Sequence, residues 1–271
     1  MRLPRLRYVL LAPVILFAAL YVFVAIKFAT EDDSIATIDG PLAEYDTIAI
    51  FGATGTAGDG LLKAALADPQ IKKIHVITRR MSPRIEEGVA SGKVHATLHM
   101  DYLDYTSVRE QIADADAVFW AIGITSIGTD EETYVKIHVD FPMRFVTEWT
   151  SVSNKSDISF HYISSSDISA DSSAMWARVK VRAEEALIGF AAGSDLRVIA
   201  YRPDYIGPTP EEAHLGQKLL YWFFAPVKSA VRAREIGQAM IEVTARGSEF
   251  ENGRRLHTIA ILRYSDAYER R

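Results

Sequence analysis

Residues 47–67 of this 271-residue chain read TIAIFGATGTAGDGLLKAALA. The run starts with apolar and β-branched residues, continues through three glycines spaced GxxGxxG, and ends in residues typical of a helix. A strand, a glycine-rich turn and a helix in this order present backbone N–H groups and the positive end of a helix to a pyrophosphate. The run therefore predicts the first strand–turn–helix unit of a dinucleotide-binding sheet, in preference to a tight turn without a ligand. The loop residues expected to bind the cofactor are Gly52, Thr54, Gly55, Thr56, Ala57 and Gly58.

The second predicted strand ends in Thr78, Arg79 and Arg80. A NAD site commonly has an acidic residue here for the ribose hydroxyls, whereas NADP requires a cation for the 2′-phosphate. A guanidinium group can bind phosphate oxygens with two parallel hydrogen bonds. We therefore expect NADP(H) to be preferred over NAD(H), with Arg79 and Arg80 as phosphate ligands. The alternative is that the two arginines form a solvated loop.

Short apolar runs rich in Val and Ile recur beyond residue 44, with stretches of helix length between them. Such strands indicate a parallel sheet that is covered on both faces. We expect one α/β domain over residues 44–271, a Rossmann-like doubly wound parallel sheet. Its small C-terminal substrate subdomain would contain a final helix over residues 233–243 and a strand near residues 256–261. The other expected strands cover residues 47–51, 74–78, 94–99, 117–122, 158–163 and 196–201.

Two further strand ends fit the same cofactor cleft, because ligands of open α/β sheets bind at the carboxyl ends of the strands. Asp101 and Tyr102 follow the third strand and are expected beside an adenine. Ala121 and Gly123 follow the fourth strand, where small residues let a cofactor cross the sheet edge.

The motifs GATGTAG, TRR, AIG, YISSS, WARVKVRAEEAL and YRPDYIGPT follow one another in this order. This order resembles the short-chain dehydrogenase/reductase superfamily, in its atypical branch with a GxxGxxG loop. Within that branch the chain is most similar to NAD(P)H-binding, Tat-interacting oxidoreductase-like proteins. The resemblance covers residues 44–271 and implies a nicotinamide dinucleotide cofactor, with the turn at Pro203 facing the nicotinamide.

In that superfamily a Ser, a Tyr and a Lys four residues after the Tyr form the reaction centre. The resemblance assigns the lysine to Lys180 and the serine to the run Ser164–Ser166, with Ser165 and Ser166 as the candidate catalytic residues. The tyrosine position holds Trp176, whose indole N–H donates hydrogen bonds but has no useful acidity near neutral pH. Nearby phenols at Tyr162, Tyr201 and Tyr205 are expected in the core or the cleft lining.

Two functions remain open at this point. The first is an oxidoreductase that reduces a carbonyl of an unknown, apolar small-molecule substrate. The second is a catalytically degenerate scaffold or redox sensor that binds NAD(P) and acts through partners. A sugar-nucleotide epimerase is disfavoured by the missing tyrosine and the short C-terminal region.

The first 30 residues differ from the rest of the chain. They carry four basic residues and no acid, and residues 8–26 are uncharged. At about 1.5 Å per residue, such a stretch nearly spans a bilayer core of about 30 Å. We expect a single-pass anchor in residues 1–30 that contacts the lipid bilayer through residues 8–28, and a linker over residues 31–43. A cleaved signal peptide is the alternative, although no small-x-small site follows the stretch. The charge bias predicts a cytoplasmic N-terminus and a body on the far side, in tension with cytosolic NADPH.

The composition excludes several other classes. With 49% hydrophobic and 24% charged residues, the chain is a folded protein rather than a disordered one. It carries a net charge of −5 and no long basic run, so nucleic acid is not an expected partner. It has no cysteine, and its seven histidines lack metal-binding spacing, so no metal is expected. The apolar run at residues 219–227 could line a substrate pocket, rest on the bilayer, or belong to the core.

Overall fold

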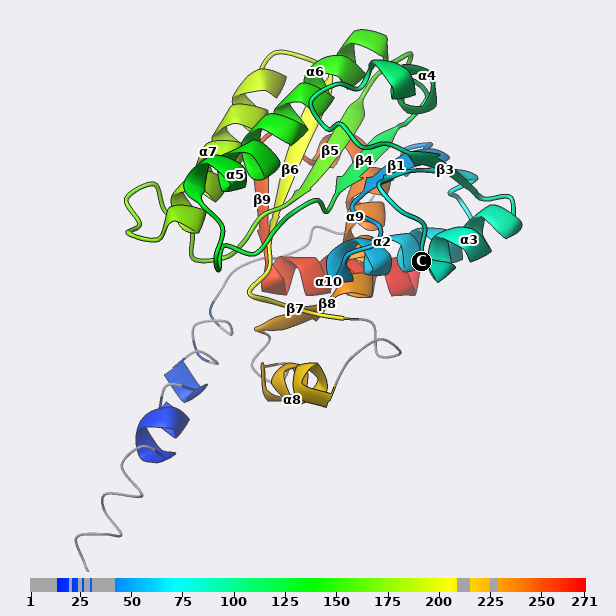
Figure 1. The fold of residues 1–271 in the computed structure, drawn as a ribbon. Helices are drawn as coiled ribbons and strands as arrows, with labels where there is room; N and C mark the ends of the chain where they lie inside the picture. Colours follow the sequence, from blue (N-terminus) through cyan, green and yellow to red (C-terminus); the bar gives the residue numbers. More distant parts are fainter. Residues whose placement is uncertain are drawn as a thin grey trace, which may run out of the picture.

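The computed structural model describes residues 14–19, 21–23, 26, 30, 42–208, 215–224 and 229–271. A seven-stranded sheet in the order β3-β2-β1-β4-β5-β6-β9 runs through the body, and all its strand pairs are parallel (Figure 1). The strands after β1 are added on one side of it, as β2 and β3, and then on the other side, starting with β4. Doubly wound sheets open a ligand crevice at such a switch point, here between β1 and β4. The strands are β1 (Thr47–Phe51), β2 (Lys73–Thr78), β3 (Val94–Leu98), β4 (Ala117–Trp120), β5 (Ile158–Ile163), β6 (Leu196–Arg202) and β9 (Arg254–His257).

Alternate residues of the central strands enter two separate cores. Ile48 and Ile50 of β1 pack on one side, and Ala49 and Phe51 pack on the other. All four are fully buried, which explains why the strand is a continuous apolar run. The doubly wound α/β fold expected from the sequence is confirmed.

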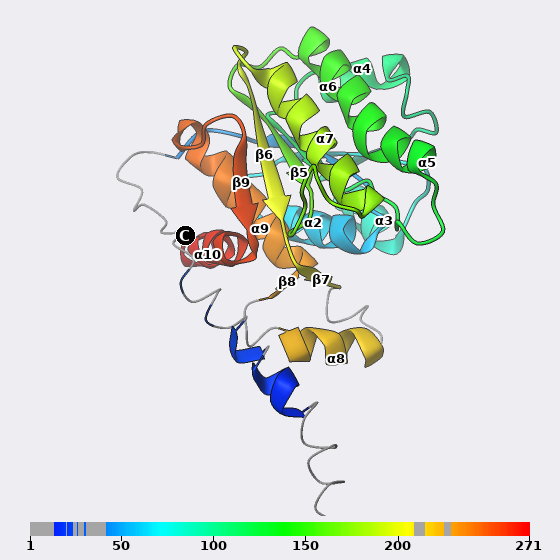
Figure 2. The ribbon, with the colours of Figure 1, turned by 90° about the vertical axis from the view of Figure 1, so that its left-hand side faces the viewer.

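Helices cover both faces of the sheet, as Figures 1 and 2 show from two sides. The first core holds α2, α9 and α10, and the second holds α4, α6 and α7. The helices are α2 (Thr56–Ala67), α3 (Pro83–Ala90), α4 (Arg109–Ile112), α5 (Glu131–Val135), α6 (Phe141–Val152), α7 (Met175–Ala191), α8 (Leu215–Phe224), α9 (Ala233–Arg246) and α10 (Thr258–Arg270), with short turns at η1 (Thr106–Val108), η2 (Lys136–Asp140) and η4 (Gly247–Glu249).

The C-terminal region differs from the sequence prediction. The expected strand near residues 256–261 is wrong beyond residue 257, because β9 ends at His257 and α10 begins at Thr258. The apolar residues of the run 256–261 suit a strand by composition, yet Ile259 and Ile261 are buried on the helix that packs against α9. The helix expected over residues 233–243 is present as α9, three residues longer, but it is not the last helix.

A small two-stranded sheet and one helix follow β6 in the sequence. Strand β7 (Tyr205–Gly207) pairs in parallel with β8 (Ala230–Arg232), and α8 lies between them in the sequence. Both views place α8 outside the main layers, beyond β7 and β8 (Figures 1 and 2). Of the apolar run 219–227, residues 219–224 belong to α8 and residues 225–227 lie outside the described part of the chain.

Only part of the expected anchor is described. Residues 14–19, 21–23 and 26 are helical, and the rest of the stretch 8–28 lies outside the described residues. Among the described residues, no helix has both the length and the apolar character that a membrane crossing requires.

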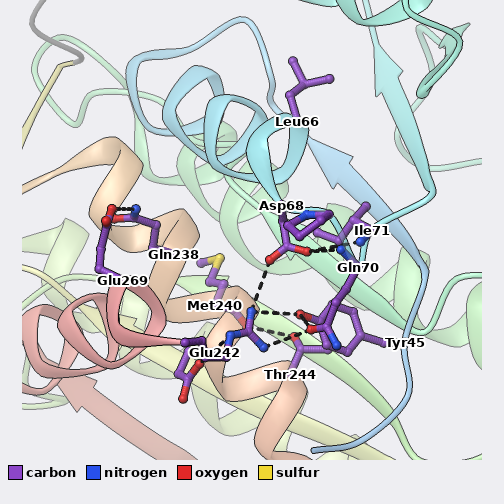
Figure 3. Close-up of polar contacts among 12 residues, drawn as sticks. Tyr45, Leu66, Asp68, Gln70, Ile71, Gln238, Met240, Glu242, Thr244 and Glu269 are labelled. Carbon is purple, nitrogen blue, oxygen red and sulfur yellow. Dashed lines mark hydrogen bonds and ion pairs between the residues drawn. The ribbon is translucent and has the colours of Figure 1, made fainter.

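A polar network around Arg271 lies near the amino end of β1, and Figure 3 shows its partners Tyr45, Asp68, Gln70 and Glu242. Its guanidinium donates hydrogen bonds to Gln70 Oε1 at 3.0 Å and to Asp68 Oδ2 at 3.2 Å, and it lies 3.4 Å from Glu242 Oε2. Tyr45, just before β1, accepts a further hydrogen bond from the same group at 3.4 Å. This network joins α2, α9 and the last helix at the sheet end opposite the glycine loop.

Candidate functional site

The glycine loop connects β1 to α2 beside the end of β4. Gly52 has φ +79°, a left-handed conformation that favours glycine, and a Cβ there would lie 2.6 Å from the backbone of Ala121. Gly55 stands at the start of α2 and donates its N–H to the Gly52 carbonyl at 3.0 Å. In the described part of the chain, no side chain caps the first turn of α2. The N–H groups of that turn are therefore available to an anion.

A pocket of about 230 Å³ lies against this loop at the carboxyl ends of β1, β2 and β4. It brings together seven of the residues expected to bind the cofactor and five that the sequence analysis did not select. The expected residues are Gly52, Thr54, Gly55, Arg79, Tyr102, Ala121 and Gly123, and the additional ones are Thr78, Ile122, Ile124, Ile137 and Phe141.

The five additional pocket residues differ in how far the sequence could have indicated them. Thr78, Ile122 and Ile124 adjoin residues that had been selected at the same strand ends. Ile137 and Phe141 come from η2 and α6. They lie four positions apart on one helical face, but only tertiary packing turns that face toward the pocket, so sequence spacing alone does not reveal it.

Several expected residues lie outside the described walls of the pocket. The carboxylate of Asp101 is exposed and accepts a hydrogen bond from Leu103 N at 2.9 Å. Arg80 is also exposed, and its carbonyl accepts a hydrogen bond from the Thr78 hydroxyl at 2.8 Å. The others are Thr56, Ala57, Gly58, Lys180, Pro203, Ser165 and Ser166.

Tyr102 and Arg79 form one end of the pocket. The Tyr102 side chain is buried, and burial raises the pKa of its phenol, while the nearby Arg79 guanidinium opposes that rise. Arg79 itself is exposed. An aromatic wall and an accessible cation thus stand together at the ends of β2 and β3.

Lys180 lies in a buried cluster beside the end of β5. Its Nζ donates a hydrogen bond to the Ile163 carbonyl at 3.0 Å and stands 5.1 Å from the centre of the Tyr162 ring. Burial lowers the pKa of Lys180 to about 8, although the Glu184 carboxylate acts to raise it. An ammonium group with this pKa can exchange a proton close to neutral pH.

The serine run and the Pro203 turn are connected through the backbone. Ser164 N donates to the Tyr201 carbonyl at 2.7 Å, and Ser166 N donates to the Pro203 carbonyl at 3.1 Å. Ser164 is buried, whereas Ser165 and Ser166 are partly exposed. These two hydroxyls therefore follow the end of β5, the strand next to β4 in the sheet.

The phenols near this cluster serve the interior. Tyr162 is fully buried and donates its hydroxyl to the His138 carbonyl at 3.3 Å. Tyr201 is also fully buried, with its hydroxyl 2.9 Å from His161 Nδ1. Burial raises the pKa of both phenols well above the usual value. Trp176 is partly buried against the second core, one helical turn before Lys180.

Glu184 connects α7 to the far strands of the sheet. The carboxylate accepts hydrogen bonds from Arg202 at 2.9 and 2.5 Å and from Arg255 at 3.0 Å. Burial acts to raise the pKa of Glu184, but hydrogen bonds from Arg202 and Arg255 outweigh it and lower that pKa. The helix that carries Lys180 is thereby fixed against β6 and β9.

His138 is a buried residue that the sequence did not single out. It lies in η2, a π-helical turn of a kind that often marks functional sites. Its Nε2 accepts a hydrogen bond from Ile124 N at 3.4 Å, and a Cβ at Gly123 would lie 3.1 Å from its ring. Burial, assisted by the positive charge of Lys180, lowers the pKa of His138 to about 3. A neutral imidazole therefore supports the pocket wall that follows β4.

Solved structures of other proteins share this fold. No family model matches the chain. A short-chain dehydrogenase/reductase from Saccharomyces cerevisiae superposes with a TM-score of 0.62 at 11% identity, covering 81% of this chain and 99% of that one. A 3-oxoacyl-[acyl-carrier protein] reductase from Brucella melitensis, solved with NAD, gives 0.59 at 15%, covering 81% and 98%. The protein BdcA, solved with NADPH, gives 0.60 at 14%, covering 78% and 92%. The chain thus has the Rossmann-like fold of short-chain dehydrogenases/reductases.

A local similarity in sequence also exists. A polyketide synthase-nonribosomal peptide synthetase, ffsA of Aspergillus flavipes, is 34% identical over 132 residues. The matched part covers 46% of this chain and 3% of that protein. The chain therefore spans only a small fraction of that much longer relative.

Proposed function

We propose that this chain is a short-chain dehydrogenase/reductase of the atypical branch, anchored in a membrane, that uses NADP(H) to reduce a carbonyl of an apolar small molecule. The observation that carries the proposal is the pocket between the glycine loop and β4, with Arg79 at its β2 side. Solved structures of similar fold hold NAD in one case and NADPH in another, which supports a nicotinamide dinucleotide.

The residues of the pocket fit such a cofactor. The backbone of Gly52 and Gly55 and the first turn of α2 would hold the pyrophosphate, since no side chain caps that turn. Tyr102 would contact the adenine, and Arg79 would bind the 2′-phosphate. Gly123, at the end of β4, would leave room for the nicotinamide half.

The reaction needs a hydride, a proton and an oriented carbonyl. The bound cofactor would supply the hydride to the carbonyl carbon. Ser165 or Ser166 would donate a hydrogen bond to the carbonyl oxygen. Because Trp176 has no acidic proton, Lys180 would supply the proton to that oxygen and recover one from solvent. The position of Lys180 four residues after Trp176, the pKa of Lys180 and the resemblance in motif order support these roles.

Calorimetry and turnover test the proposal together. The full-length protein is titrated with NADPH and with NADH, and NADPH oxidation is then followed with a panel of apolar ketones and aldehydes. We expect tighter binding of NADPH, by about tenfold or more, and turnover with at least one carbonyl compound. Equal affinity for both cofactors would contradict the NADP preference, and binding without turnover would favour the second candidate.

The second candidate is a catalytically degenerate module that binds the dinucleotide and acts as a scaffold or redox sensor through partners. Trp176 is the observation that favours it, because an indole stands where the superfamily has its proton donor. This candidate predicts cofactor binding that survives replacement of Lys180 and is accompanied by no turnover.

The membrane part of the proposal rests on the charge and hydropathy of residues 1–30. An apolar stretch preceded by arginines favours a cytoplasmic N-terminus, which would leave the body on the side away from cytosolic NADPH. Protease protection of a C-terminal tag in sealed vesicles tests this topology. Cleavage from the cytosolic face alone would reverse the topology and remove the conflict with the cofactor.

A further inference from the structure

Helix α8 presents leucines to solvent. Leu215 is 76% exposed and Leu219 is 59% exposed. The two lie four positions apart, so they share one face of the helix. Exposed apolar residues on one face of a helix are the pattern of an amphipathic helix that buries this face against a partner.

The opposite face of α8 is already occupied by the body. Tyr221 is two positions beyond Leu219, which turns it about 200° around the helix axis. The Arg232 guanidinium of β8 lies 4.9 Å from the centre of its ring, and a Cβ at Gly207 of β7 would lie 2.6 Å from it. The helix is therefore held to the small β7–β8 sheet on one side, and the two leucines on its other side are exposed.

A second exposed apolar segment of this chain indicates what covers α8. The described residues of the N-terminal stretch, among them Val14, Leu16 and Phe23, are 61%, 63% and 66% exposed. Figures 1 and 2 both place this helix on the same side of the body as α8. Lys218, also exposed, flanks the leucine face, and a lysine there can extend its ammonium to lipid headgroups.

From these observations we propose that the leucine face of α8, carried by Leu215 and Leu219, lies in the interfacial region of a lipid bilayer and forms a second membrane contact beside the anchor. This inference rests on the proposed membrane anchor. It makes the bilayer, rather than a second protein chain, the partner of the leucine face of α8.

The natural chain lacks cysteine, so single cysteines can be introduced into the full-length protein for site-specific labelling. We choose Leu219→Cys for α8 and Val89→Cys as the matched control, an apolar residue on α3 that is 43% exposed. Each variant is labelled with an environment-sensitive fluorophore and reconstituted into vesicles of phosphatidylcholine and phosphatidylglycerol. Doxyl-labelled lipid then quenches labels in the bilayer, and iodide quenches labels in water.

We expect doxyl lipid to quench the label at position 219 about threefold more than the label at position 89, with iodide showing the reverse order. Equal quenching at both positions would overturn the inference. Shielding of position 219 from both quenchers would also overturn it, by indicating a protein occupant such as a second copy or the N-terminal segment.

Flotation of the same vesicles separates this inference from the anchor on which it rests. Protein that fails to float with the vesicles contradicts the anchor and α8 together. Protein that floats, with position 219 open to iodide, contradicts α8 alone. A matching thermal unfolding midpoint for the two labelled variants confirms that the substitutions leave the body folded.

Discussion

Gly58 lies so close to Gly52 that a methyl group added at position 58 would stand 2.0 Å from the Gly52 carbonyl oxygen. The third glycine of the loop thus does not need to touch a ligand in order to matter. It lets the first turn of α2 approach the end of β1, and so sets the position of the loop that the cofactor would contact.

Gly58→Ala is therefore expected to lower the free energy of unfolding by about 1–3 kcal/mol, because the backbone must shift to admit the methyl group. It should also weaken NADPH binding by about tenfold or more, since the loop moves with it. Urea unfolding and calorimetry measure the two effects. Gly189→Ala is the matched control: it lies in α7 with no atom within 4 Å of the new methyl, and it should stabilise the helix by up to about 1 kcal/mol.

Arg79 and Arg80 provide a paired test of the 2′-phosphate contact. Arg79 lines the pocket and Arg80 does not, although the sequence treats the two alike. Arg79→Ala should weaken NADPH binding by about tenfold to a hundredfold, the cost of one charge-assisted contact, and leave NADH binding unchanged. Arg80→Ala should change neither. Equal losses for the two cofactors would show that Arg79 does not read the 2′-phosphate.

Part of the pocket could be predicted from the sequence, and part of it depends on tertiary packing. The loop, Arg79 and the ends of β3 and β4 could be predicted because strand ends of a parallel sheet meet at one edge. Ile137 and Phe141 could not, since the orientation of their helical face is decided by packing against α7 and β4. The last helix was misread because a run of β-branched residues suits either a buried strand or a helix face.

Glu184 should be the most sensitive buried charge of the site. Glu184→Gln removes the carboxylate that holds Arg202 and Arg255, and it leaves the partly buried Arg202 uncompensated. We expect a loss of about 3 kcal/mol in the free energy of unfolding, as for other broken buried ion pairs. Its neighbour Glu185 is exposed, and Glu185→Gln should stay within about 0.5 kcal/mol of the native protein. Chemical denaturation of both variants decides the comparison.

Two of the buried histidines, His138 and His161, have the strongest effect on the sensitivity of the fold to acid. Burial lowers the pKa of His138 and of His161 to about 3, below the ordinary value of 6.5. Between these values the unfolded chain binds protons that the folded chain does not, so acid favours unfolding. Each histidine should cost about 1.4 kcal/mol of stability per pH unit as the pH falls from about 6 toward 3.

Denaturation between about pH 6 and pH 3 tests the role of the two histidines. The quantity compared is the slope of the free energy of unfolding against pH, not the free energy itself. His161→Gln should flatten the slope by the share of one group, even if the variant is less stable at every pH. His95 is exposed, and His95→Gln should keep the full slope. An unchanged slope in the His161 variant would mean that other groups govern the acid sensitivity.

Lys180 and Trp176 decide between the two functions. If Lys180 supplies the proton, turnover should fall about tenfold per pH unit above pH 8, where its ammonium form is lost, and Lys180→Met should abolish turnover but not the fold. Trp176→Tyr should raise an existing turnover by about a hundredfold by placing a phenol one helical turn before Lys180.

If instead the native protein turns over no carbonyl compound and only Trp176→Tyr does, the native chain is the degenerate module. Steady-state rates against pH for the native protein and both variants separate these cases, because loss of a proton donor changes the pH profile and structural damage lowers the rate at every pH.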